Sequence, residues 1–447
     1  MKGKSIAITI WVFIVFILTL PVFANVYDCD LEYMVLDPNQ DQSGIARCFA
    51  YKDLIPMAKP DETLLAEPQY RSRTPIYSVA TFGNDKDSKF TLVFDELGGT
   101  GKGYNVVYLD YNNNENLTDD PKISLKGVWP RRSTKYNDSP AVEFGPIELM
   151  LNYEGKTLPY RFYIQFQTSY KKDVQTDSKK TLRGEQVDIR LRSGGYTVGD
   201  VKFGEQGRRI AIIDYNNNGV FNDLFKVQPM VELQNNYLYA DGDMIIVDVP
   251  ENEQPKTLDS RPYAKYINID DNWYSLNVSE DGRRIEVNEA NTEFGTIKTS
   301  QNIDSLQLNS DNGVITINEK NINEIQIPVG TYRLYGYSAQ FTDPYKQFYV
   351  RGTKLCKQFQ IEKDKVFEMK IGFPVIANIY RLPSAREQGP VKAGDSVDLS
   401  LIFTGQMGEV FTHILFSGKS SSKFPLPTFR VVDETDKTVA EGKFQYG

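Results

Sequence analysis

The chain has 447 residues, of which 40% are hydrophobic and 25% are charged, the balance of a chain that buries extended cores. Its 59 acidic residues outnumber its 51 lysines and arginines, so the net charge is −8 and the composition argues against a nucleic-acid-binding protein. A single histidine, His413, excludes chemistry that needs a histidine pair. It lies in an apolar, strand-like stretch, where we expect a packing or surface role.

The first 24 residues have the pattern of an export signal. Lys2 and Lys4 precede an apolar run from Ile6 to Leu20, and the small residues up to Ala24 suit signal peptidase. We therefore expect cleavage after Ala24 and export to the periplasm, the cell surface or the exterior. The alternative is an uncleaved N-terminal anchor, because the apolar segment is just long enough to span a bilayer.

Three cysteines follow the signal. Export allows a disulfide between Cys29 and Cys48, and the loop that it closes would contribute about 3 kcal/mol to stability. Cys356 lies in an apolar-alternating stretch, so we expect a buried strand residue there rather than a nucleophile.

The rest of the chain shows short stretches of alternating apolar and polar residues, separated by turns rich in Gly, Asn and Asp. No stretch has the pattern of a long amphipathic helix. This predicts an all-β protein of tandem β-sandwich units, Ig-like or prealbumin-like, with little helix. The predicted units are an irregular N-terminal segment (25–75), β units at 76–138 and 139–250, a linker and β-hairpin at 251–288, and β-sandwiches at 289–374 and 375–447.

One motif occurs twice, each time after an apolar strand. Both copies begin with Asp-Tyr-Asn-Asn-Asn, at Asp110 and at Asp214. Oxygen-bearing side chains stand at positions 1, 3 and 5, the positions from which tight calcium loops supply ligands, together with a backbone carbonyl at position 7. We predict a calcium ion in each loop. The candidate ligands are Asp110, Asn112, Asn114, Asp119 and Asp120 in the first copy, and Asp214, Asn216, Asn218, Asn222, Asp223 and the carbonyl of Val220 in the second.

Over about ten residues, each copy resembles the Asp-x-Asn-x-Asn-Gly calcium loops of dockerin modules and thrombospondin-type repeats. Both copies depart from those loops. Pro121 and Phe225 stand at position 12 in place of an acidic residue, and the first copy has Glu115 in place of the glycine. Because asparagines replace aspartates at positions 3 and 5, we expect weak sites, with a Kd of about 10⁻⁴–10⁻³ M. The alternative interpretation is a metal-free Asx-turn used twice.

Several further segments carry a resemblance at the scale of the whole chain. They are Phe94–Tyr104, both Asp-Tyr-Asn-Asn-Asn loops, Asp241–Asp243, Ile327–Tyr332 and Gly442–Gly447. In these the chain resembles a group of secreted multidomain β proteins of environmental Gram-negative bacteria, and the resemblance implies export and β architecture but no activity. The Pro-x-Gly-x-Tyr pattern at Pro328–Tyr332 also resembles the carboxypeptidase-regulatory or prealbumin type of β-sandwich.

No complete catalytic constellation is found in the sequence. The glycine-rich stretch Gly98–Gly103 is followed by a strand pattern instead of a helix, so it predicts a hairpin connection and not a phosphate loop. The adjacent carboxylates Asp95–Glu96 and Asp270–Asp271 would point to opposite faces of a strand, and neither pair alone can flank a glycosidic bond.

An aromatic cluster suggests a place for a sugar. Arg333, Tyr335 and Tyr337 are expected on one face of a strand, where they would form a flat platform for stacking. The alternative is ordinary cross-strand aromatic pairing.

Together these patterns predict an exported, calcium-stabilised binding or structural protein of the cell envelope or exterior, whose ligand is a glycan or a protein. The alternative is a secreted carbohydrate-active enzyme, either a glycoside hydrolase or a polysaccharide lyase, in which the Asp-Asn loops support a substrate cleft.

Overall fold

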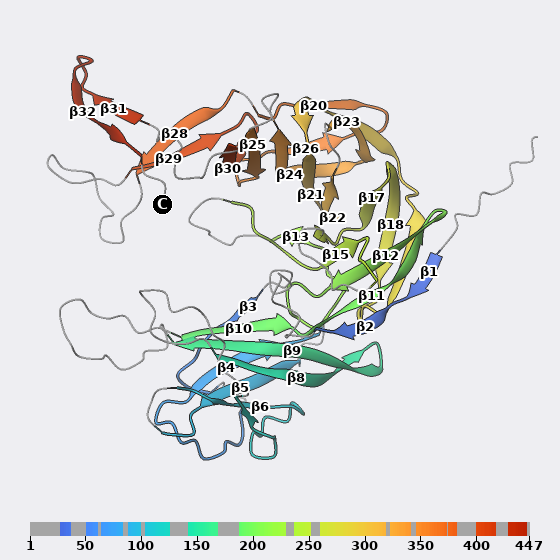
Figure 1. Ribbon diagram of the computed structural model, residues 1–447, viewed down its shortest axis with the longest axis vertical. Coiled ribbons are helices and arrows are strands. Elements are labelled where there is room, and N and C mark those ends of the chain that lie inside the picture. Colours follow the sequence, from blue (N-terminus) through green and yellow to red (C-terminus); the bar gives the residue numbers. More distant parts are fainter. Residues whose placement is uncertain are drawn as a thin grey trace, which may run out of the picture.

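The computed structural model describes fourteen stretches of the chain, and within them the protein consists of strands and turns without a helix (Figure 1). The all-β prediction is confirmed, whereas the finer Ig-like or prealbumin-like type stays a prediction. No helix that could cross a membrane occurs in these stretches. The predicted signal segment and Cys48 lie outside them. The described residues are 27–36, 51–60, 64–83, 88–99, 103–125, 142–168, 187–228, 237–251, 260–318, 322–340, 346–372, 374–381, 399–416 and 428–444.

Two four-stranded antiparallel sheets pack face to face in the first half of the chain (Figure 1). Large aromatic side chains fill the space between them, since Phe94 stacks on Phe166 at 4.6 Å between ring centroids and Phe82 lies 4.9 Å from Phe162. One sheet is β4 (Ile76–Thr81), β5 (Lys89–Asp95), β6 (Val106–Leu109) and β7 (Ile123–Ser124). The other, in spatial order, is β3 (Lys52–Leu54), β10 (Val187–Ser193), β9 (Lys156–Thr168) and β8 (Val142–Tyr153).

Two further sheets and a short ribbon adjoin these two sheets, and we call the four sheets with the ribbon the first body. Phe203 and Tyr274 join the two sheets through an edge-to-face ring contact at 5.2 Å. The five-stranded sheet has the order β16 (Ser260–Pro262), β15 (Met244–Val247), β12 (Gln206–Ile213), β11 (Gly195–Phe203) and β2 (Glu32–Val35). The four-stranded sheet has the order β1 (Tyr27–Asp30), β19 (Arg284–Glu289), β18 (Asn272–Val278) and β17 (Tyr266–Ile269), and β13 (Lys226–Val227) pairs with β14 (Ala240–Asp241).

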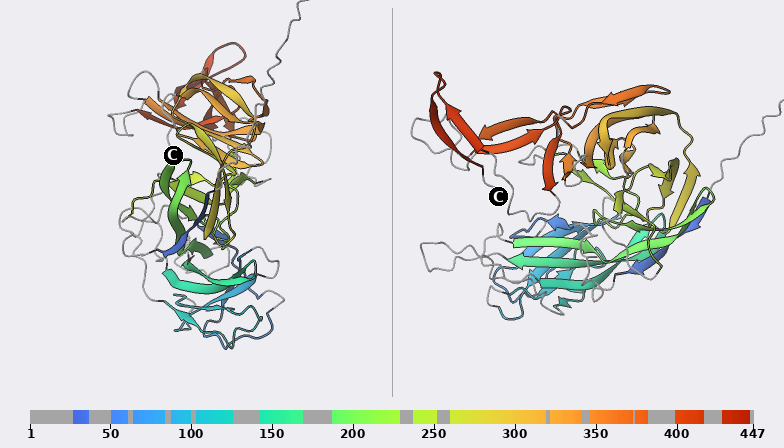
Figure 2. Two further views of the ribbon diagram at one scale, coloured as in Figure 1. Left: turned by 90° about the vertical axis from the view of Figure 1, so that its right-hand side faces the viewer. Right: turned by 45° about the horizontal axis from the view of Figure 1, so that its top comes forward.

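The C-terminal part contains three more sheets. A hairpin of β31 (Thr428–Val432) and β32 (Thr438–Lys443) projects away from the other sheets in Figure 1 and in the right-hand view of Figure 2. A three-stranded sheet has the order β23 (Ile322–Pro328), β20 (Phe294–Ile303), β27 (Val366–Met369). The largest sheet has the order β22 (Gly313–Ile317), β21 (Ser305–Ser310), β24 (Gly330–Gln340), β25 (Lys346–Arg351), β30 (Val410–Phe416), β29 (Leu399–Thr404) and β28 (Ile376–Arg381), with β26 (Gln358–Ile361) also paired to β24.

The hydrophobic cores group the strands differently from the predicted units. One buried cluster extends from Leu31 to Val287 and crosses the predicted boundaries at 138/139 and 250/251. A second extends from Ala264 to Ile371. Neighbouring residues of β18 face the two cores, because Tyr274 belongs to the first and Trp273 to the second, where its indole N–H donates to the carbonyl of Gln326 at 2.8 Å. The hairpin β17–β18 is therefore in contact with both cores.

Candidate functional site

The two Asp-Asn loops have the same backbone conformation. The first follows β6 and the second follows β12. In each, the residues at positions 4 and 6 adopt left-handed backbone angles, with φ of 54° at Asn113 and 63° at Glu115 in the first loop, and 55° at Asn217 and 82° at Gly219 in the second. Glu115 thus takes the conformation of the expected glycine, so its presence does not change the shape of the loop.

The same five hydrogen bonds form in both loops. The aspartate at position 1 accepts the backbone N–H groups of positions 5 and 6, and the asparagine at position 3 accepts the N–H of position 5. The asparagine at position 5 accepts the N–H of position 7 and donates its own amide to the aspartate at position 10. In this order the distances are 3.1, 2.9, 3.2, 2.9 and 2.9 Å in the first loop and 3.1, 2.7, 3.2, 2.8 and 2.5 Å in the second.

In each loop a further aspartate, which we call the closing aspartate, accepts the backbone N–H of the tyrosine at position 2. In the first copy this aspartate belongs to the loop itself, whereas in the second it comes from a segment distant in sequence. Asp120, at position 11, accepts the backbone N–H of Tyr111 at 3.1 Å. In the second loop the matching N–H, that of Tyr215, is bound at 3.3 Å by Asp243, which lies just before β15. Asp243 also accepts the N–H of Asp223 at 2.8 Å.

Asp243 is a site residue that the ligand prediction missed. In the sequence Asp243 is found only as part of the motif Asp241-Gly-Asp243, about twenty residues after the loop, and nothing in that motif indicates a contact with the loop. Gly242 has a φ of +139°, and a Cβ there would lie 2.6 Å from the carbonyl oxygen of Leu224, so only glycine lets this segment approach the loop closely enough.

Hydrogen bonds from several sheets of the first body meet at the second loop. Asp214 accepts the hydroxyl of Tyr160 on β9 at 2.6 Å, and the carbonyl of Gly219 accepts the hydroxyl of Tyr153 on β8 at 2.7 Å. Further bonds to the loop come from the backbone N–H of Gly83, after β4, at 2.6 Å and from that of Ser193 on β10, while Phe221 donates to the carbonyl of Glu280, after β18, at 2.9 Å. All four sheets of this body therefore meet the loop or its immediate neighbours.

The first loop is less enclosed. Asp110 is 1% exposed, but Asn112, Asn114 and Asp119 are exposed. In this loop the Oδ2 atom of Asp120 is buried and has no hydrogen-bond partner among the described residues. An orphaned carboxylate oxygen at the closing position is an atom that a bound cation would satisfy.

Burial sets the electrostatics of the second loop. Asp214 and Asp243 are fully buried, and no ion pair to either is found in the described part of the chain. Burial raises the pKa of Asp214 to about 6, although the Tyr160 hydroxyl and two loop N–H groups favour the carboxylate. Burial, with repulsion from Asp214 and Asp223, raises the pKa of Asp243 well above its usual range. Burial also lowers the pKa of Lys52, the ammonium group that partly offsets the charge of Asp214.

The oxygen set fits a hard divalent cation. Asp214 and Asp223 offer carboxylates, Asn216 and Asn218 offer amide oxygens, and the carbonyl of Val220 stands at position 7. Asn222 is half-buried, and its side chain makes no hydrogen bond within the described residues. Within the described stretches, no group of three or more His, Cys, Asp and Glu side chains is placed to hold a metal ion.

The predicted aromatic platform is not formed. A β-bulge interrupts the pairing of β21 with β24, because Gln307 pairs with Gly336 whereas Leu308 pairs with Leu334. The extra residue, Tyr335, shifts the alternation of side chains, so Tyr337 points into the second core and is 3% exposed. Tyr335 packs on Phe225 at the opposite face. Arg333 is half-buried, so the three side chains do not present one exposed face.

The cysteines, the histidine and the acidic pair singled out in the sequence lie at separate places in the fold. Cys356 is buried as expected, but in the turn between β25 and β26 rather than in a strand, and its Sγ accepts the N–H of Thr353 at 3.3 Å. Cys29 lies half-buried on β1, and its predicted disulfide stays a prediction because Cys48 is outside the described residues. His413 lies on β30 opposite Tyr349. The carboxylate of Asp95 binds the backbone N–H groups of Arg71 and Ser72 at 3.0 and 2.7 Å.

Comparison of the chain with protein-family models, with curated proteins and with solved structures finds no match.

Without divalent cations, we expect the contribution of Asp214 to the free energy of unfolding to fall as the pH rises from about 4 to about 7. An unfolded aspartate titrates near pH 4, whereas Asp214 in the folded chain titrates at about pH 6. Between these values the folded state holds a proton that the unfolded state has lost. The resulting stabilisation is complete below about pH 4, is lost as the pH rises through 6, and amounts to at most about 3 kcal/mol.

The measurement is urea unfolding in EDTA at about pH 5 and about pH 7, for the wild type and for Asp214→Asn, which keeps the shape of the side chain and removes its titration. The wild type should lose more stability between the two pH values than the variant does. Equal losses, or a wild type that gains stability relative to the variant, would contradict the assignment. Calcium should act most strongly at the higher pH, because it binds the deprotonated carboxylate.

Proposed function

We propose that the protein is an exported binding or structural protein of the cell envelope or exterior, whose Asp-Asn loops hold calcium and whose ligand is a glycan or a protein. The observation that carries the calcium assignment is the repetition of one oxygen-lined loop, with identical hydrogen bonds, after two strands of different sheets. A loop needed only to reverse the chain would not require buried carboxylates at its base.

Buried charge supports a cation in the second loop. Asp214 and Asp243 lie in one enclosed region with Asp223, and like charges so placed destabilise the metal-free state. Buried carboxylates in proteins are usually paired or bound to metal. A calcium ion would neutralise this repulsion and fix the junction of four sheets, so its role is to stabilise the scaffold.

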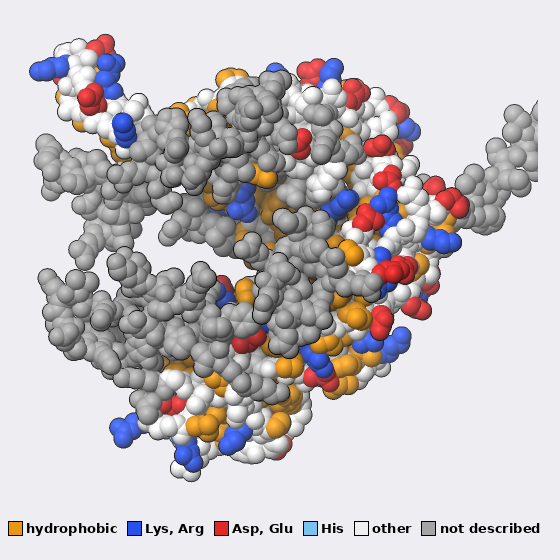
Figure 3. Space-filling view, viewed as in Figure 1, with side chains coloured by type: hydrophobic (Ala, Val, Ile, Leu, Met, Phe, Trp, Pro, Cys, Tyr) orange, Lys and Arg blue, Asp and Glu red, His pale blue; other side chains and the backbone are white. Residues whose placement is uncertain are grey.

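A binding role is supported by the adjacent carboxylates Asp95 and Glu96, because both accept hydrogen bonds from other parts of the chain. Asp95 is occupied by two backbone N–H groups, and Glu96 accepts the hydroxyl of Ser72 at 3.0 Å. Acidic and basic side chains are interspersed over the described surface that Figure 3 shows, in keeping with a ligand that is not a nucleic acid. The signal segment supports export.

Thermal unfolding of residues 25–447 tests the calcium assignment. In about 10 mM calcium, each site with a Kd of about 10⁻⁴–10⁻³ M should stabilise the chain by about 1.4–2.7 kcal/mol over the same chain in EDTA. Asp223→Asn should remove the part due to the second loop. Asp200→Asn is the matched control, since Asp200 is an exposed aspartate that pairs with Arg209 away from both loops. A melting temperature that does not respond to calcium would contradict the assignment.

Binding assays in the presence of calcium test the function itself. We expect the mature chain to be retained by an immobilised polysaccharide or by an envelope protein in pull-down experiments, without release of reducing sugar. Failure to bind a broad panel of both kinds would contradict the binding role. Release of reducing sugar, lost in Asp214→Asn, would instead favour a secreted carbohydrate-active enzyme.

A further inference from the structure

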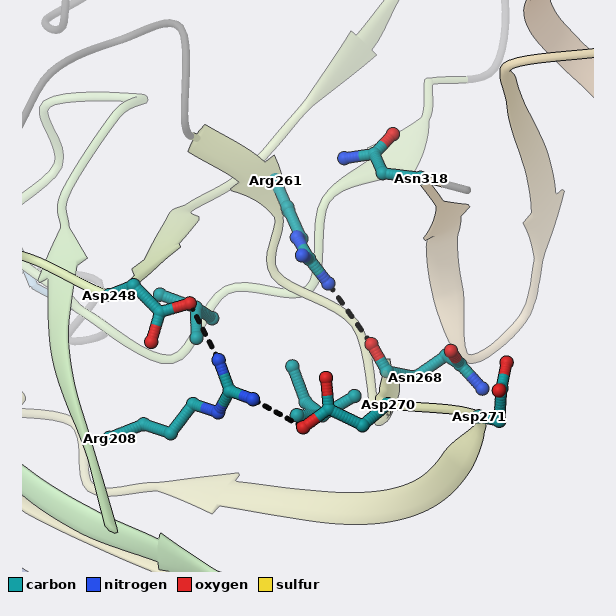
Figure 4. Close-up of a pocket in the computed structure, with 9 residues that line it drawn as sticks. Arg208, Asp248, Arg261, Asn268, Asp270, Asp271 and Asn318 are labelled. Carbon is teal, nitrogen blue, oxygen red and sulfur yellow. Dashed lines mark hydrogen bonds and ion pairs between the residues drawn. The ribbon is translucent and has the colours of Figure 1, made fainter. Parts of the chain in front are cut away.

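A polar pocket of about 480 Å³ lies at the junction of the two cores, a volume within the usual range for small-ligand sites (Figure 4). Its walls come from both sides of the junction. Arg208 on β12, Arg261 on β16 and the end of β15 belong to the first body, and Asn318 follows β22 in the largest sheet. The hairpin β17–β18, shared by both cores, supplies the remaining wall. The lining residues are Arg208, Val247, Asp248, Arg261, Asn268, Ile269, Asp270, Asp271 and Asn318.

Three aspartates of the pocket adopt left-handed backbone angles. Asp270 and Asp271, with φ of 49° and 62°, are the two turn residues of the hairpin β17–β18, and Asp248 has a φ of 65° at the end of β15. The expectation that Asp270 and Asp271 share a strand is therefore wrong. Because both residues are in a tight two-residue turn between paired strands, their carboxylates are carried on a fixed piece of backbone.

The two arginines of the pocket are held differently. Arg208 is fixed between two carboxylates, with an ion pair to Asp248 at 2.8 Å and another to Asp270. Arg261 is half-buried and donates one N–H to the carbonyl of Asn268 at 3.0 Å. No ion pair to Arg261 is found in the described part of the chain, and Figure 4 shows its guanidinium facing the pocket. Preformed polar groups of this kind fix the orientation of a ligand.

The chemistry of the lining narrows the class of ligand. An anion would meet three carboxylates, and a cation would meet two guanidinium groups. Among the described residues, the apolar side chains that line the pocket are Val247 and Ile269, and neither of them is aromatic, so an apolar ligand would find little contact. Donors from arginine and asparagine alternate instead with carboxylate acceptors, which suits hydroxyl groups, because each hydroxyl both donates and accepts.

We infer that this pocket binds the hydroxyl-rich face of a neutral saccharide, with Arg261 and Asp271 as its principal contacts. The inference rests on the glycan-binding role proposed above and assigns that role to a place in the fold. Arg261 supplies donors to sugar oxygens, and Asp271, an exposed carboxylate without an ion pair among the described residues, accepts from sugar hydroxyls.

Isothermal titration of residues 25–447, in constant calcium, tests the inference. The probes are maltotriose, cellotriose and mannotriose as neutral saccharides, glucuronate as an anion and spermidine as a cation. We expect a neutral trisaccharide to bind, and Arg261→Gln and Asp271→Ala each to weaken its binding by about tenfold or more, since each loses a hydrogen bond that involves a charged group. Arg209→Gln, on the same strand as Arg208 but paired with Asp200, should bind as the wild type does.

Thermal unfolding of each variant checks that it is folded, and Asp271→Ala, at an exposed turn position, remains informative if Arg261→Gln is unstable. Unchanged affinity in both variants would overturn the pocket assignment while leaving glycan binding elsewhere intact. Binding of glucuronate or spermidine alone would overturn the ligand class. Absence of binding to every trisaccharide would overturn the inference, and pull-down of an envelope protein by the same chain would show that the broader binding role survives.

Discussion

The second Asp-Asn loop concentrates charge at the place where the first body is joined together. Its carboxylate at Asp214 is fully buried and is bound by the Tyr160 hydroxyl and by two N–H groups of the loop itself. Hydrogen bonds connect the same ten residues to strands β8, β9 and β10 and to the residues that follow β4 and β18. A charged group at such a junction is unfavourable unless it is neutralised, because the surrounding medium cannot screen it. The stability of the whole body therefore depends on what neutralises this loop.

The first loop has the same hydrogen bonds as the second but is not surrounded by other strands of the described part of the chain. Its hydrogen bonds match those of the second within 0.4 Å, yet its asparagines are exposed and its closing aspartate, Asp120, comes from the loop itself. The second loop takes its closing aspartate, Asp243, from a segment near β15. The contact with Asp243 connects the loop to the next strand of the sheet. It also adds a second buried carboxyl group, whose pKa is raised by burial and by the neighbouring aspartates. The same pattern of hydrogen bonds thus forms an exposed turn after β6 and a contact point between sheets after β12.

The sequence allows local features to be predicted better than long-range ones. Alternation of apolar residues predicts the strands, and the spacing of Asp and Asn predicts two equivalent loops, because both properties depend on neighbouring residues. Asp243 could not be assigned to the second loop, since its position depends on the packing of Gly242 against Leu224. The β-bulge at Tyr335 also has no clear local signal, and it reverses the side on which Tyr337 lies. The extent of the first core, from Leu31 to Val287, likewise depends on contacts between residues far apart in sequence.

The most direct measurement is an anomalous difference map from crystals of residues 25–447 grown with calcium. We predict a peak in the second loop, about 2.3–2.6 Å from the carbonyl oxygen of Val220 and from a carboxylate oxygen of Asp214 or Asp223. The amide oxygens of Asn216 and Asn218 should be turned toward it. A second, weaker peak is expected in the first loop beside Asp120. A map without a peak in the second loop, in which Asn218 still donates its amide to Asp223, would contradict this prediction.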